Sequence, residues 1–212
     1  MHYLQQLISQ GEHQQLDFKF AISDAKKIAR TLCSFSNTDG GKLLIGVKDN
    51  GTLYGIRSEE EYYVLEAASE MYCRPKVKLE FKKWTIQSKT ILEVTVPRGN
   101  KRPYFAPAED GSWHAYIRVN DHNLKANRIM TEVWRRTRRN SRFTVVFSEK
   151  ERALMKIMEE KGKMSFTEIL KYLCLTVKDA EEILIKLACI NVVHIQITPE
   201  GIFYAREEQD GH

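Results

Sequence analysis

The sequence predicts an α+β protein in which a larger N-terminal domain precedes a small helical domain that ends in a hairpin. Apolar and polar residues alternate strictly over residues 15–20, which is typical of a strand with one buried face. Helical and strand patterns then follow one another in mixed order as far as about residue 140. Helical patterns dominate after that point, and two strand patterns surround a turn within residues 192–206.

The first elements of the N-terminal domain are a short helix over residues 2–9 and the strand at 15–20. In this strand Asp17 and Lys19 share the polar face, which we expect to point to solvent. The later elements are a helix from a cap at Ser23 or Asp24 to about Ser36, an apolar strand at 42–47, a turn at 48–51 with a returning strand TLYGI, a helix at 58–72, strands at 76–87, 90–96 and 113–119, and a helix from Asn127 to about residue 138.

Composition places the chain among globular proteins that carry no membrane span. Hydrophobic residues make up 42% of the 212 residues and charged residues 29%, and no apolar run reaches the ~18–20 residues that a membrane helix needs. The N-terminal letters MHYLQQ show no secretion signal, and the four cysteines are widely spaced. The expectation is a cytoplasmic protein with reduced thiols and no zinc site.

The net charge of +5 is spread unevenly along the chain. Residues 127–142 carry six arginines and one glutamate, whereas residues 143–212 carry nine basic and twelve acidic residues. A polyanion is therefore expected to approach the N-terminal two thirds of the chain.

The C-terminal domain, expected to span residues 141–212 after a first domain at 1–140, has the plan of a winged helix. Its predicted helices are 148–161, 165–173 and 177–190. The third of them, in the position of a recognition helix, carries two lysines against three acids, which suits a docking or dimerisation role better than DNA reading.

Three acids and a lysine are candidates for a metal-dependent phosphodiesterase site: Glu12, Asp17 and Asp49 as ligands of Mg²⁺ or Mn²⁺, with Lys19 near the phosphate. The D-x-K order is weak evidence by itself. The alternative is that Glu12 and Asp17 form a solvated strand face and that Asp49 belongs to a turn.

Two stretches are candidates for phosphate contacts. The loop PRGNKRPYFAPAEDGS and the strand after it mix basic and aromatic residues, a combination that holds single strands, although the aromatic residues could equally belong to the core. The segment NRIMTEVWRRTRRNSR places arginines along one helix face, although these could also be solvated. The candidates are Arg98, Lys101, Arg102, Tyr104, Arg118, Arg135, Arg138, Arg139 and Arg142.

The glycine pair Gly40–Gly41 is interpreted as turn chemistry, since no phosphate-loop spacing accompanies it. A nucleotide-sensing module is accordingly disfavoured.

Three ordered blocks give the sequence a family resemblance. GEHQQLDFKF, FSNTDGGKLLIGVKDNGTLYGI and RPYFAPAEDGSWHAYIRVND resemble the successive motifs of the Schlafen AlbA_2 domain over about residues 8–136. The resemblance implies nucleic-acid binding, and bacterial members often add a C-terminal helix-turn-helix domain and are described as predicted transcriptional regulators. In some animal members the family implies a metal-dependent endoribonuclease with three acids in its site. Carried over by motif, these acids would fall on Glu12, Asp17 and Asp49.

This sequence departs from the animal enzymes in three ways. Position 17 holds Asp, which is one methylene shorter than Glu, and Lys48 precedes Asp49 where animal members tend to show consecutive acids. The chain also has one lobe, whereas the animal enzymes pair two lobes around structured RNA. The first hypothesis is therefore a homodimeric, DNA-binding transcriptional regulator that needs no cofactor for binding and has DNA or RNA but no membrane as partner. The alternative is a Mg²⁺- or Mn²⁺-dependent endoribonuclease.

Overall fold

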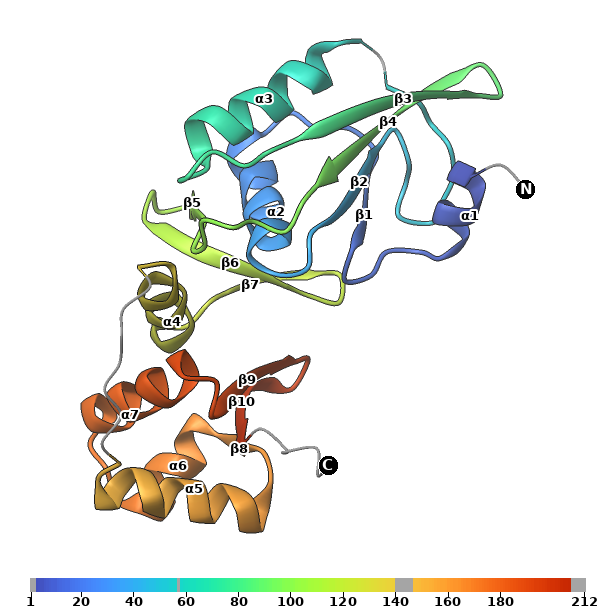
Figure 1. The fold of residues 1–212 in the computed structure, drawn as a ribbon. Coiled ribbons are helices and arrows are strands. Elements are labelled where there is room, and N and C mark those ends of the chain that lie inside the picture. The colour runs from blue at the N-terminus through green and yellow to red at the C-terminus, as the bar shows by residue number, and fades with distance from the viewer. Residues whose placement is uncertain (1–2, 57, 140–146, 207–212) are drawn as a thin grey trace. The chain divides into compact units, whose positions relative to one another are not determined.

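The computed structural model describes residues 3–56, 58–139 and 147–206, and the chain divides into two compact units, Met1–Ala126 and Asn127–His212 (Figure 1). The sequence predicted a domain boundary after residue 140. In the structure the second unit begins at Asn127. The reason is that the arginine-rich helix packs on the second unit, where Ile129 joins the apolar core. Among the described residues no helix is long and apolar enough to cross a membrane.

Unit 1 contains two sheets. The larger has the order β1–β2–β4–β3, with β1 parallel to β2 and the other pairs antiparallel, and the smaller is the antiparallel β5–β6–β7. In chain order the elements are α1 (Tyr3–Ser9), β1 (Leu16–Lys19), α2 (Ala25–Asn37), β2 (Gly41–Ile45), α3 (Glu60–Tyr72), β3 (Glu80–Ile86), β4 (Lys89–Val96), β5 (Phe105–Pro107), β6 (Trp113–Val119) and β7 (His122–Lys125).

Helix α2 is the central element of unit 1. It packs against α3, against β4 of the larger sheet and against β5, β6 and β7 of the smaller one (Figure 1). Its apolar stripe, which includes Ile28, Leu32 and Phe35, is buried in the main core together with Leu43 and Val94 of the larger sheet. A second apolar cluster on the other face of that sheet includes residues of α1. The polar side of α2 is therefore left to face β6, β7 and the end of β1.

Strand β1 differs from the expected strand in two respects. It ends at Lys19, so Phe20 does not join the buried face and is 39% exposed. Asp17 lies on the face opposite Leu16 and Phe18 but is only 3% exposed, because β6 covers it with Arg118. The expectation that Asp17 points to solvent is therefore wrong.

The turn after β2 also differs from the sequence expectation. The predicted returning strand TLYGI is reduced to a single antiparallel bridge between Val47 and Leu53. The turn itself is present, with a hydrogen bond of 2.7 Å from the Gly51 amide to the Lys48 carbonyl, and Gly51 takes a positive φ of 79°. Asp49 is an exposed residue of this turn.

Unit 2 consists of four helices and a three-stranded sheet of order β8–β10–β9 among its described residues. Its core includes Ile129 of the first helix and Leu154, Leu184 and Tyr204 of later elements. The elements are α4 (Arg128–Arg138), α5 (Glu149–Lys161), β8 (Met164–Ser165), α6 (Phe166–Leu173), α7 (Val177–Cys189), β9 (Val193–Thr198) and β10 (Gly201–Arg206).

Candidate nucleic-acid interface

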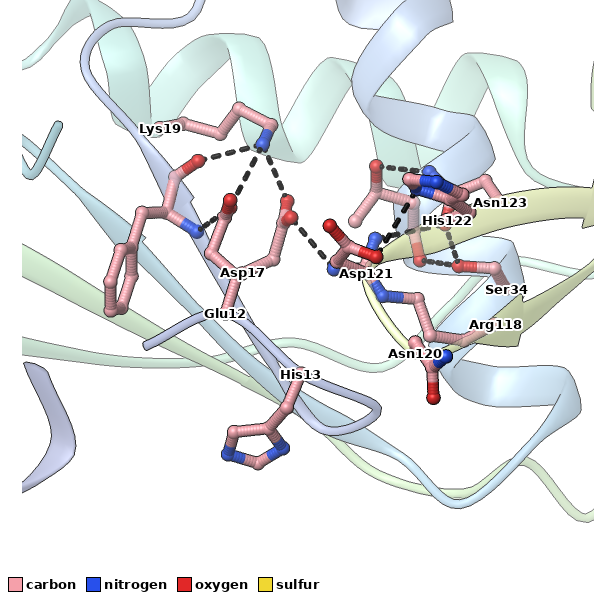
Figure 2. A network of polar contacts seen from close by, with 12 residues as sticks. Glu12, His13, Asp17, Lys19, Ser34, Arg118, Asn120, Asp121, His122 and Asn123 are labelled. Carbon is pink, nitrogen blue, oxygen red and sulfur yellow. Dashed lines mark hydrogen bonds and ion pairs between the residues drawn. The ribbon is translucent and has the colours of Figure 1, made fainter. Parts of the chain in front are cut away.

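A buried carboxylate on β1 is the centre of the candidate site. One oxygen of Asp17, Oδ1, lies 2.8 Å from Nη2 of Arg118, and the other, Oδ2, lies 2.8 Å from Nζ of Lys19 (Figure 2). The contact with Lys19 is an ion pair without the geometry of a directed hydrogen bond. Because Asp17 is almost fully buried, its charge needs these two cations close by.

Glu12 lies beside this pair, just before β1. Its Oε1 accepts a hydrogen bond of 2.8 Å from the Phe18 amide, and Lys19 Nζ lies 3.7 Å away. Burial raises the pKa of Glu12; the Phe18 amide acts against this, and the neighbouring Asp17 adds to it. Glu12 therefore holds its proton to a higher pH than an exposed glutamate does.

Arg118 links this acid group to α2. Its Nη1 lies 3.2 Å from Oδ1 of Asn123 on β7, which also accepts a hydrogen bond of 2.6 Å from Ser34. The Asn123 amide in turn donates to Thr31 Oγ1 at 2.9 Å. We call Glu12, Asp17, Lys19, Arg118 and Asn123 the Asp17 network (Figure 2). It joins the end of β1 to β6, β7 and the polar side of α2.

Every member of the Asp17 network except Glu12 lines a pocket of about 430 Å³, here called the α2 pocket. The loop 21–24 and the first turns of α2 also line it, with Lys27 and Arg30 among the lining residues. Neither was singled out by the sequence, although Lys27, Arg30, Thr31 and Ser34 share one helix face at spacings of three and four residues. That polar stripe is the signal that could have identified them.

The basic loop after β4 is held by Asn37 at the end of α2. The Asn37 amide donates at 2.8 Å to the Tyr104 carbonyl and accepts at 2.8 Å from the Tyr104 amide, and its backbone carbonyl lies 3.4 Å from Arg102 Nη1. Burial, and then the nearby Arg98, lower the pKa of Arg102. Arg98 and Lys101 are exposed, whereas Tyr104 is a core residue at 5% exposure.

Two predicted contact residues therefore have a different place. Tyr104 cannot stack on a base, because the main core covers its ring. Arg118 does not lie on the open surface, since it is 2% exposed and paired with Asp17. Tyr116, another aromatic residue of this region, is also in the core. The alternative that placed the aromatic residues in the core is confirmed for Tyr116.

The first residue of the pair Gly40–Gly41 is required by the conformation and close packing of the backbone. Gly40 has a φ of +72°, and a Cβ there would lie 2.8 Å from the Val96 carbonyl oxygen and 2.8 Å from the Arg98 amide nitrogen. Any other residue would push the basic loop away from β2. This is turn chemistry, as expected.

The arginine helix α4 uses part of its charge inside unit 2. Arg128 pairs with Glu181 of α7, and Arg136 Nη2 lies 2.9 Å from Glu182 on the same helix. Arg135 pairs with Glu132 within α4. Three further candidates remain in this segment: Arg138 and Arg139 are exposed, and Arg142 lies outside the described residues.

Helix α7 presents little surface beyond its first turn. Val177 and Lys178 are exposed, whereas every residue from Ala180 to Cys189 is buried or half-buried. Helix α4 packs along α7 and covers part of it. A recognition helix that enters a DNA groove needs one exposed face, and α7 offers only its N-terminal end.

The three acids expected to bind a metal do not come together. Glu12 and Asp17 are neighbours, but Asp49 belongs to an exposed turn, and the described part of the chain contains no cluster of three His, Cys, Asp or Glu side chains able to hold an ion. The oxygens of Asp17 already face two cations. These residues do not fit a divalent metal in this arrangement.

Fold and site together define a class: an α+β domain in which a mixed sheet carries a buried Asp–Lys–Arg network beside a pocket lined by basic side chains. Residues 12–127 match the family model of Schlafen, AlbA_2, which is more than half of the 212-residue chain. The protein belongs to the Schlafen AlbA_2 family.

Two solved structures are similar to this chain at 18% sequence identity. One is the crystal structure of the DIP2311 protein from Corynebacterium diphtheriae, with a TM-score of 0.46 over 89% of this chain and 34% of the other. This chain thus spans about a third of that protein. The other is the NMR structure of the N-terminal domain of a RecG-related protein from Nitrosomonas europaea, with a TM-score of 0.39 over 70% of this chain and 97% of the other. No curated protein matches the chain.

Proposed function

We propose that this protein binds nucleic acid through unit 1 and does not require a metal to do so. One observation carries the proposal: the acids of the site are neutralised inside the protein, because both oxygens of Asp17 face a cation. Lys27 and Arg30 on the pocket and Arg98 on the loop then add positive charge to the surface. Membership of the Schlafen AlbA_2 family supports the same function.

The finer proposal is a dimeric, cytoplasmic DNA-binding regulator whose second unit is a winged helix. The order of α5, α6 and α7 followed by the β9–β10 hairpin supports the winged-helix plan. Because α7 is largely buried within unit 2, we assign the phosphate contacts to unit 1.

Retention of nucleic acid by the full chain tests the proposal. Purified protein is titrated into labelled duplex DNA, single-stranded DNA and RNA at 50 mM salt with EDTA present. We expect a mobility shift that weakens as salt is raised, since each displaced phosphate counterion adds to the salt slope. The proposal fails if none of the three polymers is retained.

Metal-dependent cleavage of structured RNA stays a separate prediction, and no assembled ligand set among the described residues favours it. It is tested by incubating the protein with transfer RNA in the presence and absence of Mn²⁺. Fragments that need Mn²⁺ and that vanish with Asp17→Asn would support cleavage, and intact RNA with wild-type protein would contradict it.

A further inference from the structure

The α2 pocket contains hydrogen-bond donors that the protein leaves unused. Arg118 is 2% exposed, and its Nε–H is buried with no partner anywhere in the described residues. The buried Nε–H of Arg30 is likewise without a partner in that part of the chain. Both residues line the α2 pocket. Buried guanidinium donors of this kind ordinarily find an acceptor, so two of them beside one cavity point to a ligand that supplies it.

The charges around the pocket favour an anion. Four basic and three acidic side chains line it. Two of the acids are engaged: Asp17 by Arg118 and Lys19, and Asp24 by the amides of Lys26 and Lys27, which it caps. The third, Asp121, is exposed, and its Oδ1 lies 3.2 Å from Nδ1 of His122.

The two basic residues of α2 that line the pocket lack a strong internal partner. Arg30 meets Glu109 at 3.5 Å, but the Glu109 side chain is 90% exposed and water screens the pair. Lys27 has no ion-pair partner among the residues that the structure describes. Because α2 is capped by its own Asp24, the donors offered to a ligand are side chains and not helix amides.

We propose that the α2 pocket binds one phosphate group of a nucleotide unit, held by the lining residues Arg30, Arg118 and Lys27. The choice of ligand rests on the proposed function. Guanidinium groups suit a phosphate because its several oxygens accept from more than one N–H at once.

The pocket has room for more than the phosphate. Its volume of about 430 Å³ lies in the range of small-molecule sites, and Ile22 and Ile28 add apolar lining next to the charged residues. A sugar attached to the phosphate could lie against these side chains. The phosphate comes either from a nucleic-acid strand or from a free nucleotide.

Calorimetric titration of the full chain tests the site with three probes: adenosine 5′-monophosphate, inorganic phosphate and adenosine. The first two are expected to bind and adenosine is not. Arg30→Gln and Lys27→Gln should each weaken monophosphate binding by about tenfold, as expected for the loss of a charge-assisted hydrogen bond. Arg30→Lys should restore only part of it, because lysine keeps the charge but not the fork.

The matched control is Lys26→Gln. Lys26 is the neighbour of Lys27 on α2, is exposed, and does not line the pocket, so this variant should bind like the wild type. Equal losses in the Lys26 and Lys27 variants would mean that only general charge matters and would overturn the proposal. No heat with the monophosphate or with phosphate would overturn it as well.

Competition distinguishes the two sources of the phosphate. A 5′-phosphorylated oligonucleotide that displaces the monophosphate, when its 5′-hydroxyl counterpart does not, assigns the pocket to a strand end. Displacement by neither assigns it to a free nucleotide, and equal displacement by both assigns it to internal phosphates. If polymers bind at 50 mM salt but Arg30→Gln changes neither polymer nor monophosphate binding, the pocket proposal fails while the proposed function stands. If the monophosphate binds and no polymer does, the proposed function fails while the pocket proposal stands.

Discussion

Arginine is used in opposite ways in the two units. In unit 1, Arg118 is buried against Asp17, its Nη1 lies near Asn123, and it lines the α2 pocket. In unit 2, Arg128 and Arg136 pair with glutamates of α7 and hold one helix against another. The segment with the highest arginine density thus directs part of its charge inward. Charge counted along a sequence does not identify the residues that are available to a phosphate.

The ion pairs between α4 and α7 also affect how the acids of α7 are interpreted. The acids on α7 argue against DNA reading when the sequence is considered alone. In the structure Glu181 and Glu182 are partners of α4, so they do not by themselves repel DNA. The burial of α7 beyond its first turn is the stronger argument against DNA reading by this helix.

The largest expected effect is that of Arg118→Met. This change leaves the Asp17 carboxylate buried with Lys19 as its remaining cation, and we expect unfolding free energy to fall by about 3–5 kcal/mol, as when a buried pair loses one member. Urea denaturation measures it. The double variant Asp17→Asn/Arg118→Met should recover part of the loss, and a single-variant effect below about 1 kcal/mol would contradict the buried-pair interpretation.

An intermediate effect is expected on the salt dependence of nucleic-acid binding, which we compare for one arginine variant in each unit. Arg98→Gln in the exposed loop should lower the slope of log K against log salt by about 0.9 on duplex DNA, because one phosphate contact is lost. Arg136→Gln should leave the slope unchanged, since Glu182 already engages that arginine. If the α4 variant lowers the slope and the loop variant does not, then the comparison between the units is wrong.

A smaller effect concerns pH and Glu12. A raised folded-state pKa means that the folded protein holds this proton more tightly than the unfolded chain does. The stability from this group is complete below the ordinary value of 4.5 and is lost as pH rises through the raised one. Glu12→Gln should therefore remove this loss and leave stability at pH 7 equal to or above that of the wild type.

Thermal or urea unfolding of both proteins from pH 4 to pH 8 checks this expectation. A variant that is less stable than the wild type at pH 7 would show that the ionised carboxylate stabilises the fold. Glu12→Gln should also retain nucleic-acid binding, whereas the endoribonuclease alternative predicts that it loses cleavage.

The smallest effect is expected for the ion pair between α4 and α7. A double-mutant cycle of Arg136→Gln and Glu182→Gln should give a coupling energy of about 0.2–1 kcal/mol, because both side chains are partly exposed. Raising salt should reduce it. A coupling energy of about 3–5 kcal/mol, the effect expected for the buried Arg118–Asp17 pair, would mean that the two pairs do not differ in strength.

Local patterns were sufficient for most of the elements. The helical spacing of α2, its cap at Asp24, the cap of α4 at Asn127 and the hairpin β9–β10 were all predicted, because each depends on residues close in sequence. The strands β5 and β7 were not, since they are short and defined by pairing with β6. The family was also predicted, and the match over residues 12–127 confirms it.

The sequence by itself determined the α+β class, the family and the presence of Glu12, Asp17 and Lys19 on one short segment. Only the tertiary structure decided what surrounds them. Arg118 is 101 residues from Asp17 along the chain, and no local pattern indicates that β6 brings its guanidinium to that carboxylate. Burial then decides the chemistry: the same acid that would attract a metal ion on a solvated face is neutralised here by two cations, and the buried Nε–H groups of Arg30 and Arg118 have no acceptor among the described residues.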